Sequence, residues 1–218
     1  MTTLLWSRRS QVRTRPVSHR LGSMALGEEF RHRGQMASAE LPLIVVLIAG
    51  PQASGKSTLA AAVATALREQ GEAVALIELD QIAAMALPTL PSWDDAHRIF
   101  ESVTGMWART GLTCVVAEGS GTYDELRRLR SQVPEGAATV TVAATAPFAV
   151  AFDRAQADPT RGVSKEREFL GGVYERWPRQ LTRIDPDVLI DTNAVPVDLG
   201  VAHIRDAIAS ARADLSTH

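Results

Sequence analysis

The chain has 218 residues, of which 45% are hydrophobic and 22% are charged, and its net charge is −2. This composition is typical of a globular domain and excludes a fibrous or wholly disordered chain. The nearly balanced charge also argues against a protein that holds nucleic acid by bulk positive charge.

The first 40 residues differ in charge from the rest of the chain. They contain seven arginines and three glutamates, whereas the remaining residues contain 16 basic and 22 acidic side chains. Because residues 1–40 show neither helical nor strand periodicity, we predict a flexible basic extension there and a single domain over 41–218. The alternatives for the extension are an Arg-rich targeting peptide, an arm that binds polyanions, or a true translation start at Met24 or Met36.

Cysteine content and hydropathy indicate the compartment. Cys114 is the only cysteine, so no intrachain disulfide can form, which fits a reducing environment. The longest apolar run, residues 43–49, is too short to span a bilayer, and the first residues lack the apolar segment of a secretory signal. We therefore expect a cytoplasmic protein without a membrane partner.

Apolar strands and amphipathic helices are predicted to alternate from residue 43 onward. The predicted strands are 43–49, 73–79, 113–117, 138–144 and 188–190. The predicted helices are 57–70, 81–87, 93–109, 122–131, 147–156, 165–181 and 198–213. Strands that alternate with helices form right-handed crossovers, so we predict an α/β fold of three layers, with helices on both faces of a mostly parallel five-stranded sheet.

A phosphate-binding motif follows the first predicted strand. Residues 50–57 read Gly-Pro-Gln-Ala-Ser-Gly-Lys-Ser and fit G-x-x-x-x-G-K-[ST], between a buried strand and a helix, which is the context that supports the motif. In such a loop the backbone N–H groups surround the β-phosphate, the lysine reaches the β- and γ-phosphates, and the Ser hydroxyl ligates Mg²⁺. We therefore predict a P-loop NTPase fold with ATP and Mg²⁺ as cofactors, Ser57 as a metal ligand, and a nucleotide site made of Gly50, Gln52, Ala53, Ser54, Gly55, Lys56, Ser57 and Thr58.

Carboxylates follow the next two predicted strands, at the edge where parallel sheets bind ligands. We predict that Asp80 is the base that orients an acceptor hydroxyl, although Asp is also a favoured helix cap. Glu118 is predicted to contact Mg²⁺ through water, and the alternative is a salt-bridged loop residue. Glu78 is predicted either to share the Mg²⁺ shell or to lie in a polar seam.

A basic segment is predicted to form a short lid. Residues 158–162 contain a proline and a glycine that interrupt the flanking helices. We predict that Arg154 and Arg161 neutralise the charge that grows on a transferring phosphoryl group. The alternative is a solvated basic loop, which is the usual fate of surface charge.

Taken together, the Gly50–Ser57 loop, Asp80 and the arginine segment resemble small P-loop kinases that phosphorylate metabolites or antibiotics. The pattern resembles the chloramphenicol phosphotransferase-like group most, with shikimate and gluconate kinases as more distant relatives. The resemblance implies Asp80 as the base and places the adenine near Thr192 and Asn193. The run Glu78-Leu79-Asp80 replaces the Asp-x-Asp pair of shikimate kinases, and residues 118–121 lack their glycine triplet, which counts against shikimate as substrate.

The predicted function is ATP- and Mg²⁺-dependent transfer of phosphate to a hydroxyl of a small molecule. Its pocket is expected between the end of the second strand and helix 93–109, with an apolar wall of Met85, Trp93, Phe100 and Trp107, unless these residues simply pack in the core. The alternatives are an NTPase that switches conformation and a nucleic-acid-associated ATPase that uses the basic extension. No Asn-Lys-x-Asp run is present, which counts against a GTPase. The sequence does not specify the acceptor or the oligomeric state.

Overall fold

Five parallel strands form the central sheet in the computed structural model, which describes residues 41–217. The strand order is β2-β3-β1-β4-β5, and every neighbouring pair is parallel. The predicted α/β fold with a five-stranded sheet is confirmed, while the prediction for residues 1–40 lies outside the described residues. The strands are β1 Ile44–Ala49, β2 Val74–Glu78, β3 Cys114–Glu118, β4 Ala138–Thr145 and β5 Val188–Asp191.

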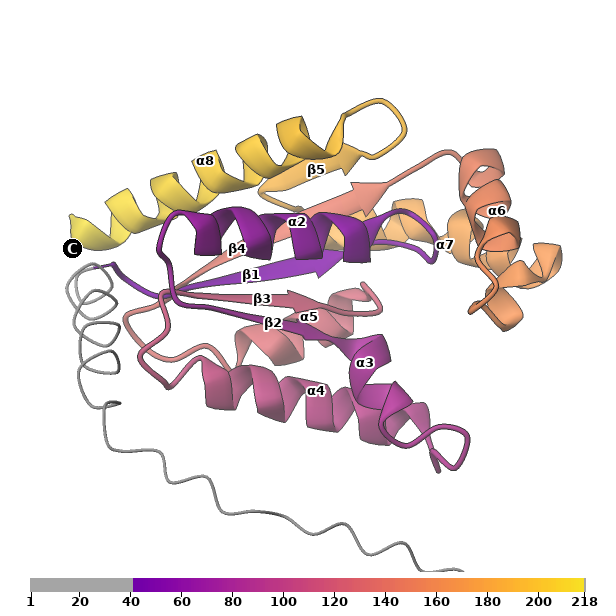
Figure 1. Ribbon diagram of the computed structural model, residues 1–218, viewed down its shortest axis with the longest axis horizontal. Helices are drawn as coiled ribbons and strands as arrows, with labels where there is room; N and C mark the ends of the chain where they lie inside the picture. The colour runs from indigo at the N-terminus through magenta and orange to yellow at the C-terminus, as the bar shows by residue number, and fades with distance from the viewer. Residues whose placement is uncertain (1–40, 218) are drawn as a thin grey trace, which may run out of the picture.

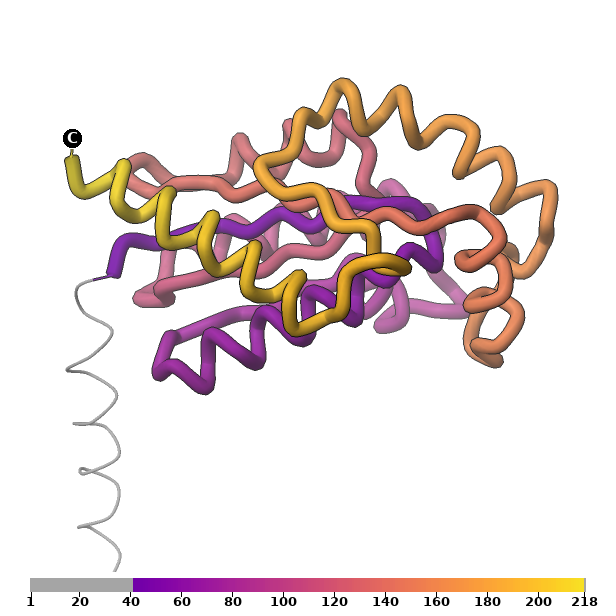
Figure 2. Tube along the Cα trace, turned by 90° about the horizontal axis from the view of Figure 1, so that it is seen from above, coloured from indigo at the N-terminus to yellow at the C-terminus, as the bar shows by residue number. Residues whose placement is uncertain are grey.

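Helices cover both faces of the sheet (Figure 1). One face carries α2 (Lys56–Glu69) and α8 (Val197–Ser216). The other carries α4 (Trp93–Trp107), α5 (Tyr123–Arg130) and α7 (Arg167–Ile184). The shorter elements lie near the carboxyl ends of the strands, as Figures 1 and 2 show; they are α3 (Leu79–Ala84), α6 (Phe148–Ala157) and the 3₁₀ turn η1 (Val163–Lys165).

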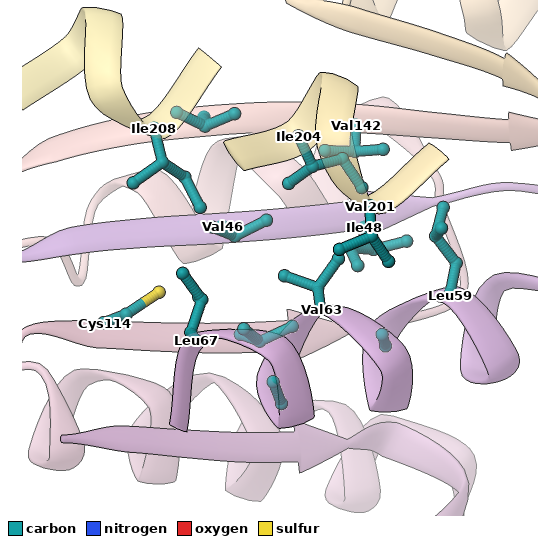
Figure 3. Packing of buried hydrophobic residues seen from close by; sticks show 14 of the residues in the cluster. Val46, Ile48, Leu59, Val63, Leu67, Cys114, Val142, Val201, Ile204 and Ile208 are labelled. Atoms are coloured by element: carbon teal, nitrogen blue, oxygen red, sulfur yellow. The ribbon is translucent and has the colours of Figure 1, made fainter. Parts of the chain in front are cut away.

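The central strand β1 explains the continuous apolar run at residues 43–49. Its alternate side chains point to opposite faces, so Val46 and Ile48 pack under α2 and α8 while Val45 and Leu47 pack under α4 and α5. All of β1 is buried, and Figure 3 shows Val63 and Leu67 of α2 facing Ile204 and Ile208 of α8 across this core. Because helices cover both faces of β1, every side chain of this strand is apolar, and the phosphate-binding motif begins only where the strand ends.

Two of the differences from the predicted boundaries affect the site and the core. Strand β2 ends at Glu78 and α3 begins at Leu79, two residues before the predicted helix, so Asp80 lies in the first turn of a helix rather than between the strand and the helix. Helix α7 continues through Pro178 to Ile184, because Trp177 and Ile184 on either side of the proline are buried against the sheet. Burial of apolar side chains therefore outweighs the hydrogen bond that proline cannot donate.

Candidate active site

The loop between β1 and α2 folds back over the end of the sheet. Gly50 lies so close to β4 that a Cβ atom there would come within 2.2 Å of the Ala144 carbonyl oxygen. Gly55, the residue before α2, has φ +92°, in the left-handed region that glycine favours. Ala53 also adopts positive φ, at 61°. The two glycines of the motif thus stand where a side chain would either clash or strain the backbone, and the loop encloses a cradle of backbone N–H groups.

Lys56, Ser57 and Glu118 form a polar cluster beside this loop. Lys56 Nζ lies 3.2 Å from Glu118 Oε1 and 3.4 Å from the Pro51 carbonyl oxygen, and Ser57 Oγ donates to Glu118 Oε2 at 3.4 Å. Glu118 is buried at the end of β3, directly opposite Ile48 of β1. Burial raises the pKa of the Glu118 carboxyl, and the Lys56 ammonium opposes that shift.

These residues fit a magnesium ion bound together with a nucleotide. The hydroxyl of Ser57 and the carboxylate of Glu118 are the hard oxygen donors that Mg²⁺ prefers. Within residues 41–217 no group of three or more His, Cys, Asp or Glu side chains could hold a metal by itself. Mg²⁺ is characteristically held by one or two protein groups and takes its remaining ligands from phosphate and water.

Acidic side chains concentrate at this edge of the sheet. Glu78 pairs in register with Glu118 on the neighbouring strand, so both side chains end at the same level. Burial and the nearby Asp80 carboxylate raise the pKa of Glu78, and both Glu78 and Asp80 also act to raise that of Glu118. These carboxylates therefore disfavour one another's ionised forms, and the Lys56 ammonium beside Glu118 offsets part of that repulsion.

A pocket of about 390 Å³ opens beside the cluster, and we call it the acceptor pocket. Asp80 and Lys56 both line it. The complete lining is Gln52, Lys56, Leu79, Asp80, Trp93, His97, Glu118, Gly119, Ser120, Val163 and Phe169. Segments far apart in the sequence thus meet around one cavity, and the turn η1 and the start of α7 contribute Val163 and Phe169.

Of the four residues predicted for the apolar wall, only Trp93 lines this pocket. Phe100 is completely buried in the core, while Met85 is 80% and Trp107 46% exposed. The prediction was wrong for these three. Met85 directly follows α3 and points to solvent. Phe100 and Trp107 belong to α4, which leads away from the pocket: at 1.5 Å per residue, they lie roughly 10 and 20 Å further along the helix axis than Trp93. The missing part of the wall comes instead from Leu79, Val163 and Phe169.

A second pocket, of about 210 Å³, lies on the other side of the phosphate loop, and we call it the nucleotide pocket. Arg154 is tied to this pocket, since its two terminal nitrogens donate to Thr192 Oγ1 at 2.9 Å and to the Thr192 carbonyl at 3.1 Å. Thr192 in turn donates to the Ser54 carbonyl at 2.6 Å. The lining is Gly55, Thr58, Leu59, Arg154, Ile190, Thr192, Val195, Pro196 and Val197.

The remaining predicted residues lie outside both pockets. Asn193 is exposed, and its backbone N–H donates to Asp191 Oδ1, so Thr192 alone of the predicted pair lines the nucleotide pocket. Arg161 forms an ion pair with Asp158 at 3.2 Å within its own turn. The structure therefore brings Arg154 to the phosphate loop through Thr192 and leaves Arg161 in the segment between α6 and η1.

A sequence model of one kinase family, described as adenylylsulphate kinase, matches residues 43–168, which is more than half of the chain. The chain belongs to the adenylylsulphate kinase family. The match covers the phosphate loop, Asp80, Glu118 and the segment that contains Arg154 and Arg161. No curated protein sequence matches the chain significantly.

Solved structures of three P-loop kinases share the fold of this adenylylsulphate kinase family member. Shikimate kinase from Acinetobacter baumannii, in complex with shikimate, is 19% identical with a TM-score of 0.55, covering 80% of this chain and 96% of that one. APS kinase from Mycobacterium tuberculosis, in complex with AMPPNP and APS, is 16% identical with a TM-score of 0.54, covering 78% and 99%. A gluconokinase from Sinorhizobium meliloti is 20% identical with a TM-score of 0.51, covering 79% and 95%.

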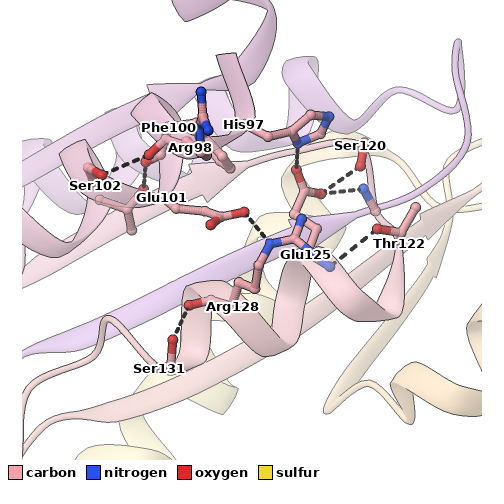
Figure 4. Close-up of polar contacts among 12 residues, drawn as sticks. His97, Arg98, Phe100, Glu101, Ser102, Ser120, Thr122, Glu125, Arg128 and Ser131 are labelled. Carbon is pink, nitrogen blue, oxygen red and sulfur yellow. Dashed lines mark hydrogen bonds and ion pairs between the residues drawn. The ribbon is translucent and has the colours of Figure 1, made fainter. Parts of the chain in front are cut away.

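Two residues of the acceptor pocket region in this family member were not predicted. Glu125 is completely buried and accepts hydrogen bonds from Ser120 Oγ at 2.8 Å and from the Gly121 N–H at 2.9 Å, and it lies 2.9 Å from His97 Nδ1 (Figure 4). The pattern Thr122-x-x-Glu125 is a local signal of a capping box, and Thr122 Oγ1 does accept from the Glu125 N–H. His97 carries no such signal, because its partner lies 28 residues further along the chain.

Gly121 packs directly against the phosphate loop, and replacing it should disturb that loop. Its φ is +81°, and a Cβ atom would come within 2.5 Å of the Gly50 backbone nitrogen. We expect Gly121→Ala to lower the free energy of unfolding by more than about 1 kcal/mol, since alanine is strained at positive φ, and to weaken nucleotide binding because Gly50 must shift. Denaturant unfolding and calorimetric titration with ATP measure the two effects.

Gly136→Ala is the matched control for this prediction. Gly136 has nearly the same φ, +80°, but nothing lies within 4 Å of its missing Cβ atom. Both variants therefore carry the backbone strain, and only Gly121→Ala adds the clash with Gly50. Equal losses of stability and equal nucleotide affinity in the two variants would contradict a role for the close approach at Gly121.

Proposed function

We propose that the protein transfers the γ-phosphoryl group of ATP to a hydroxyl of a small-molecule acceptor. The observation that carries the proposal is the placement of the two pockets on either side of one phosphate loop. Gly55 and Thr58 line the nucleotide pocket, whereas Gln52 and Lys56 line the acceptor pocket. A phosphoryl group held at the loop would thus face a second, separate cavity. Membership of a kinase family supports the nucleotide side of this proposal.

The nucleotide pocket is proposed to hold the base and ribose of ATP. Pro196 and Val197 offer apolar surface, and Arg154, fixed by Thr192, offers a planar cation that can stack on an aromatic ring. The loop from Gly50 to Thr58 would then surround the phosphates, with Lys56 turning from Glu118 to the β- and γ-phosphates. Arg161, in the turn before η1, is the residue proposed to approach the phosphates when this segment closes.

Ser57 and Glu118 are the residues proposed to hold Mg²⁺. The ion, when bound, would neutralise phosphate charge during transfer. Glu118 is already deprived of water by burial and depends on a cation, which Lys56 supplies in this structure. The movement of Lys56 to the phosphates would leave that carboxylate ready for the metal.

Asp80 is proposed to receive the proton of the acceptor hydroxyl. It stands in the first turn of α3, directly after β2, and lines the acceptor pocket together with Lys56. As the oxygen of the acceptor bonds to phosphorus, the bond from phosphorus to the β,γ-bridging oxygen breaks and ADP leaves, while the hydroxyl proton passes to an Asp80 carboxylate oxygen. Positioning and charge neutralisation supply most of the catalysis in this class of reaction.

The acceptor can be identified by a screen that follows ADP formation and then locates the new phosphate by phosphorus NMR. The first compounds to test are adenylyl sulfate, shikimate, gluconate and chloramphenicol, because the family, the similar structures and the sequence resemblance point to them. We expect ADP to form only with an acceptor present and a phosphate monoester to accumulate in equal amount. ADP formation at the same rate with and without every acceptor would instead favour an NTPase that hydrolyses ATP.

A further inference from the structure

His97 is a polar residue of the acceptor pocket that the proposed mechanism does not use. Its Nδ1 lies 2.9 Å from Glu125 Oε1, and its side chain is 22% exposed whereas that of Glu125 is fully buried. Figure 4 shows the second ring nitrogen on the side of the imidazole away from Glu125. Among the hydrogen bonds of residues 41–217, none involves that nitrogen, Nε2. The imidazole is therefore held by Glu125 through Nδ1, while Nε2 has no hydrogen-bond partner among the described residues.

The carboxylate of Glu125 is held as an anion by its surroundings. Burial opposes ionisation, but the hydrogen bonds from His97, the Gly121 N–H and Ser120 outweigh it and keep the pKa of Glu125 below its usual range. An ionised carboxylate can only accept hydrogen bonds, so His97 Nδ1 must carry a proton. Nε2 then donates when the imidazole is protonated and accepts when it is neutral.

Charged groups around His97 favour the protonated ring. Glu125 and Arg128 face it from α5, and Glu101 faces it from its own helix, while Arg128 is itself paired with Glu101 at 2.6 Å. Asp80 and Lys56 line the same pocket from α3 and α2. The hydrogen bond to Glu125 raises the pKa of His97 despite partial burial. The hydrogen bond to Glu125 thus extends the pH range over which Nε2 acts as a donor.

The acceptor pocket also has an apolar part. Trp93 and Phe169 are 51% and 37% exposed, and both line the acceptor pocket. We propose that His97 is a specificity-determining residue of the acceptor site, which selects hydroxyl compounds with an apolar ring that packs along Trp93 and Phe169 and a carboxylate or carbonyl oxygen that accepts a hydrogen bond from His97 Nε2. This inference rests on the proposed phosphotransferase function, because it takes the pocket to be the acceptor site.

Two small probes separate the contribution of His97 from that of the apolar wall. 4-(Hydroxymethyl)benzoate and benzyl alcohol share a ring and a hydroxyl, and only the first has a carboxylate. We expect the full chain, with AMPPNP and Mg²⁺ bound, to bind the benzoate roughly tenfold more tightly at pH 6, as one charge-assisted hydrogen bond implies. The preference should decline as the pH rises through the pKa of His97. Chemical-shift titration measures both affinities.

The variant His97→Asn tests the residue itself. The asparagine amide can replace Nδ1 as the donor to Glu125 but has no atom at the position of Nε2, so the fold should persist while the preference for the benzoate is lost. Arg98→Asn is the control, because Arg98 is exposed, pairs with Asp95 and does not line the pocket. If His97→Asn fails to fold, the role of His97 is tested instead by the pH dependence of the preference for the benzoate in the unaltered chain.

Four outcomes would each overturn the proposal. Two concern binding to the unaltered chain: equal affinity for the two probes, or failure of both to bind. The other two concern the preference: it survives in His97→Asn, or it does not change with pH. Binding is measured without turnover, whereas the proposed phosphotransferase function is judged by ADP and phosphate ester formation. A chain that shows the expected preference but phosphorylates no acceptor would refute the function alone, and a chain that phosphorylates an acceptor without the preference would refute the role of His97 alone.

Discussion

Lys56→Ala is expected to abolish phosphoryl transfer, with kcat falling by at least about 10²- to 10³-fold, the loss typical for removal of a group that stabilises transition-state charge. Lys56 is the lysine of the phosphate loop, and its ammonium lies 3.2 Å from Glu118 at the border of the acceptor pocket. Without it, no charged side chain of the loop reaches the phosphates. Steady-state ADP formation with the acceptor found in the screen measures the effect.

The same substitution should also destabilise the fold, and that effect can be separated from catalysis. Lys56→Ala leaves the buried Glu118 carboxylate without its cation, so the protein unfolds at lower temperature unless Glu118 is protonated. The double variant Lys56→Ala/Glu118→Gln removes the unpaired charge and should regain part of the lost stability without regaining activity. Arg179→Ala, which removes an exposed cation on α7, serves as the control. Wild-type turnover in Lys56→Ala would disprove the role assigned to the phosphate loop.

Asp80→Asn is expected to lower kcat by roughly 10²-fold or more while ATP binding changes little, which is the size of effect seen on loss of a general base. Asparagine keeps the shape of the side chain and one accepting oxygen in the first turn of α3 but cannot take the acceptor proton. Asp80 lines the acceptor pocket and does not line the nucleotide pocket. Calorimetric titration with ATP and initial rates at saturating acceptor test the two halves of the prediction.

The control for Asp80→Asn is Asp94→Asn, because Asp94 is likewise an exposed acid in the first turn of a helix but lies outside both pockets. Both substitutions weaken the favourable interaction with the helix dipole to a similar extent. A loss of activity shared by the two variants would assign the effect to helix stability. Unchanged turnover in Asp80→Asn would remove Asp80 from the mechanism.

Much of the proposed nucleotide site could be predicted from the sequence, because its phosphate loop is formed by residues that are consecutive in the chain. The order of the strands and helices, and the position of residues 50–57 between a buried strand and a helix, follow from hydrophobic periodicity and from one contiguous motif. Thr192 was predicted through a resemblance, and the structure places it in the nucleotide pocket. The roles assigned to Asp80, Arg154 and Arg161 stay predictions.

The acceptor side was predicted less well because its walls come from several elements at once. The helical pattern of α4 indicates which face is apolar, but not which part of that face lies under the sheet and which part lies at its edge. Phe100 is therefore a core residue and Trp93 a pocket residue, although both belong to the same amphipathic helix. Phe169 lies 76 residues beyond Trp93, and no local pattern relates the two.

The sequence by itself determined an α/β kinase fold and the phosphate loop, since strand burial and loop conformation depend on local residue order. Tertiary structure decided the shape and charge of the acceptor pocket. In the folded protein β2 ends at Glu78 and α3 begins at Leu79, so Asp80 lies on a helix. His97 of α4 pairs with the buried Glu125 of α5. Such pairings depend on how helices pack over a twisted sheet, which brings together side chains that are far apart along the chain.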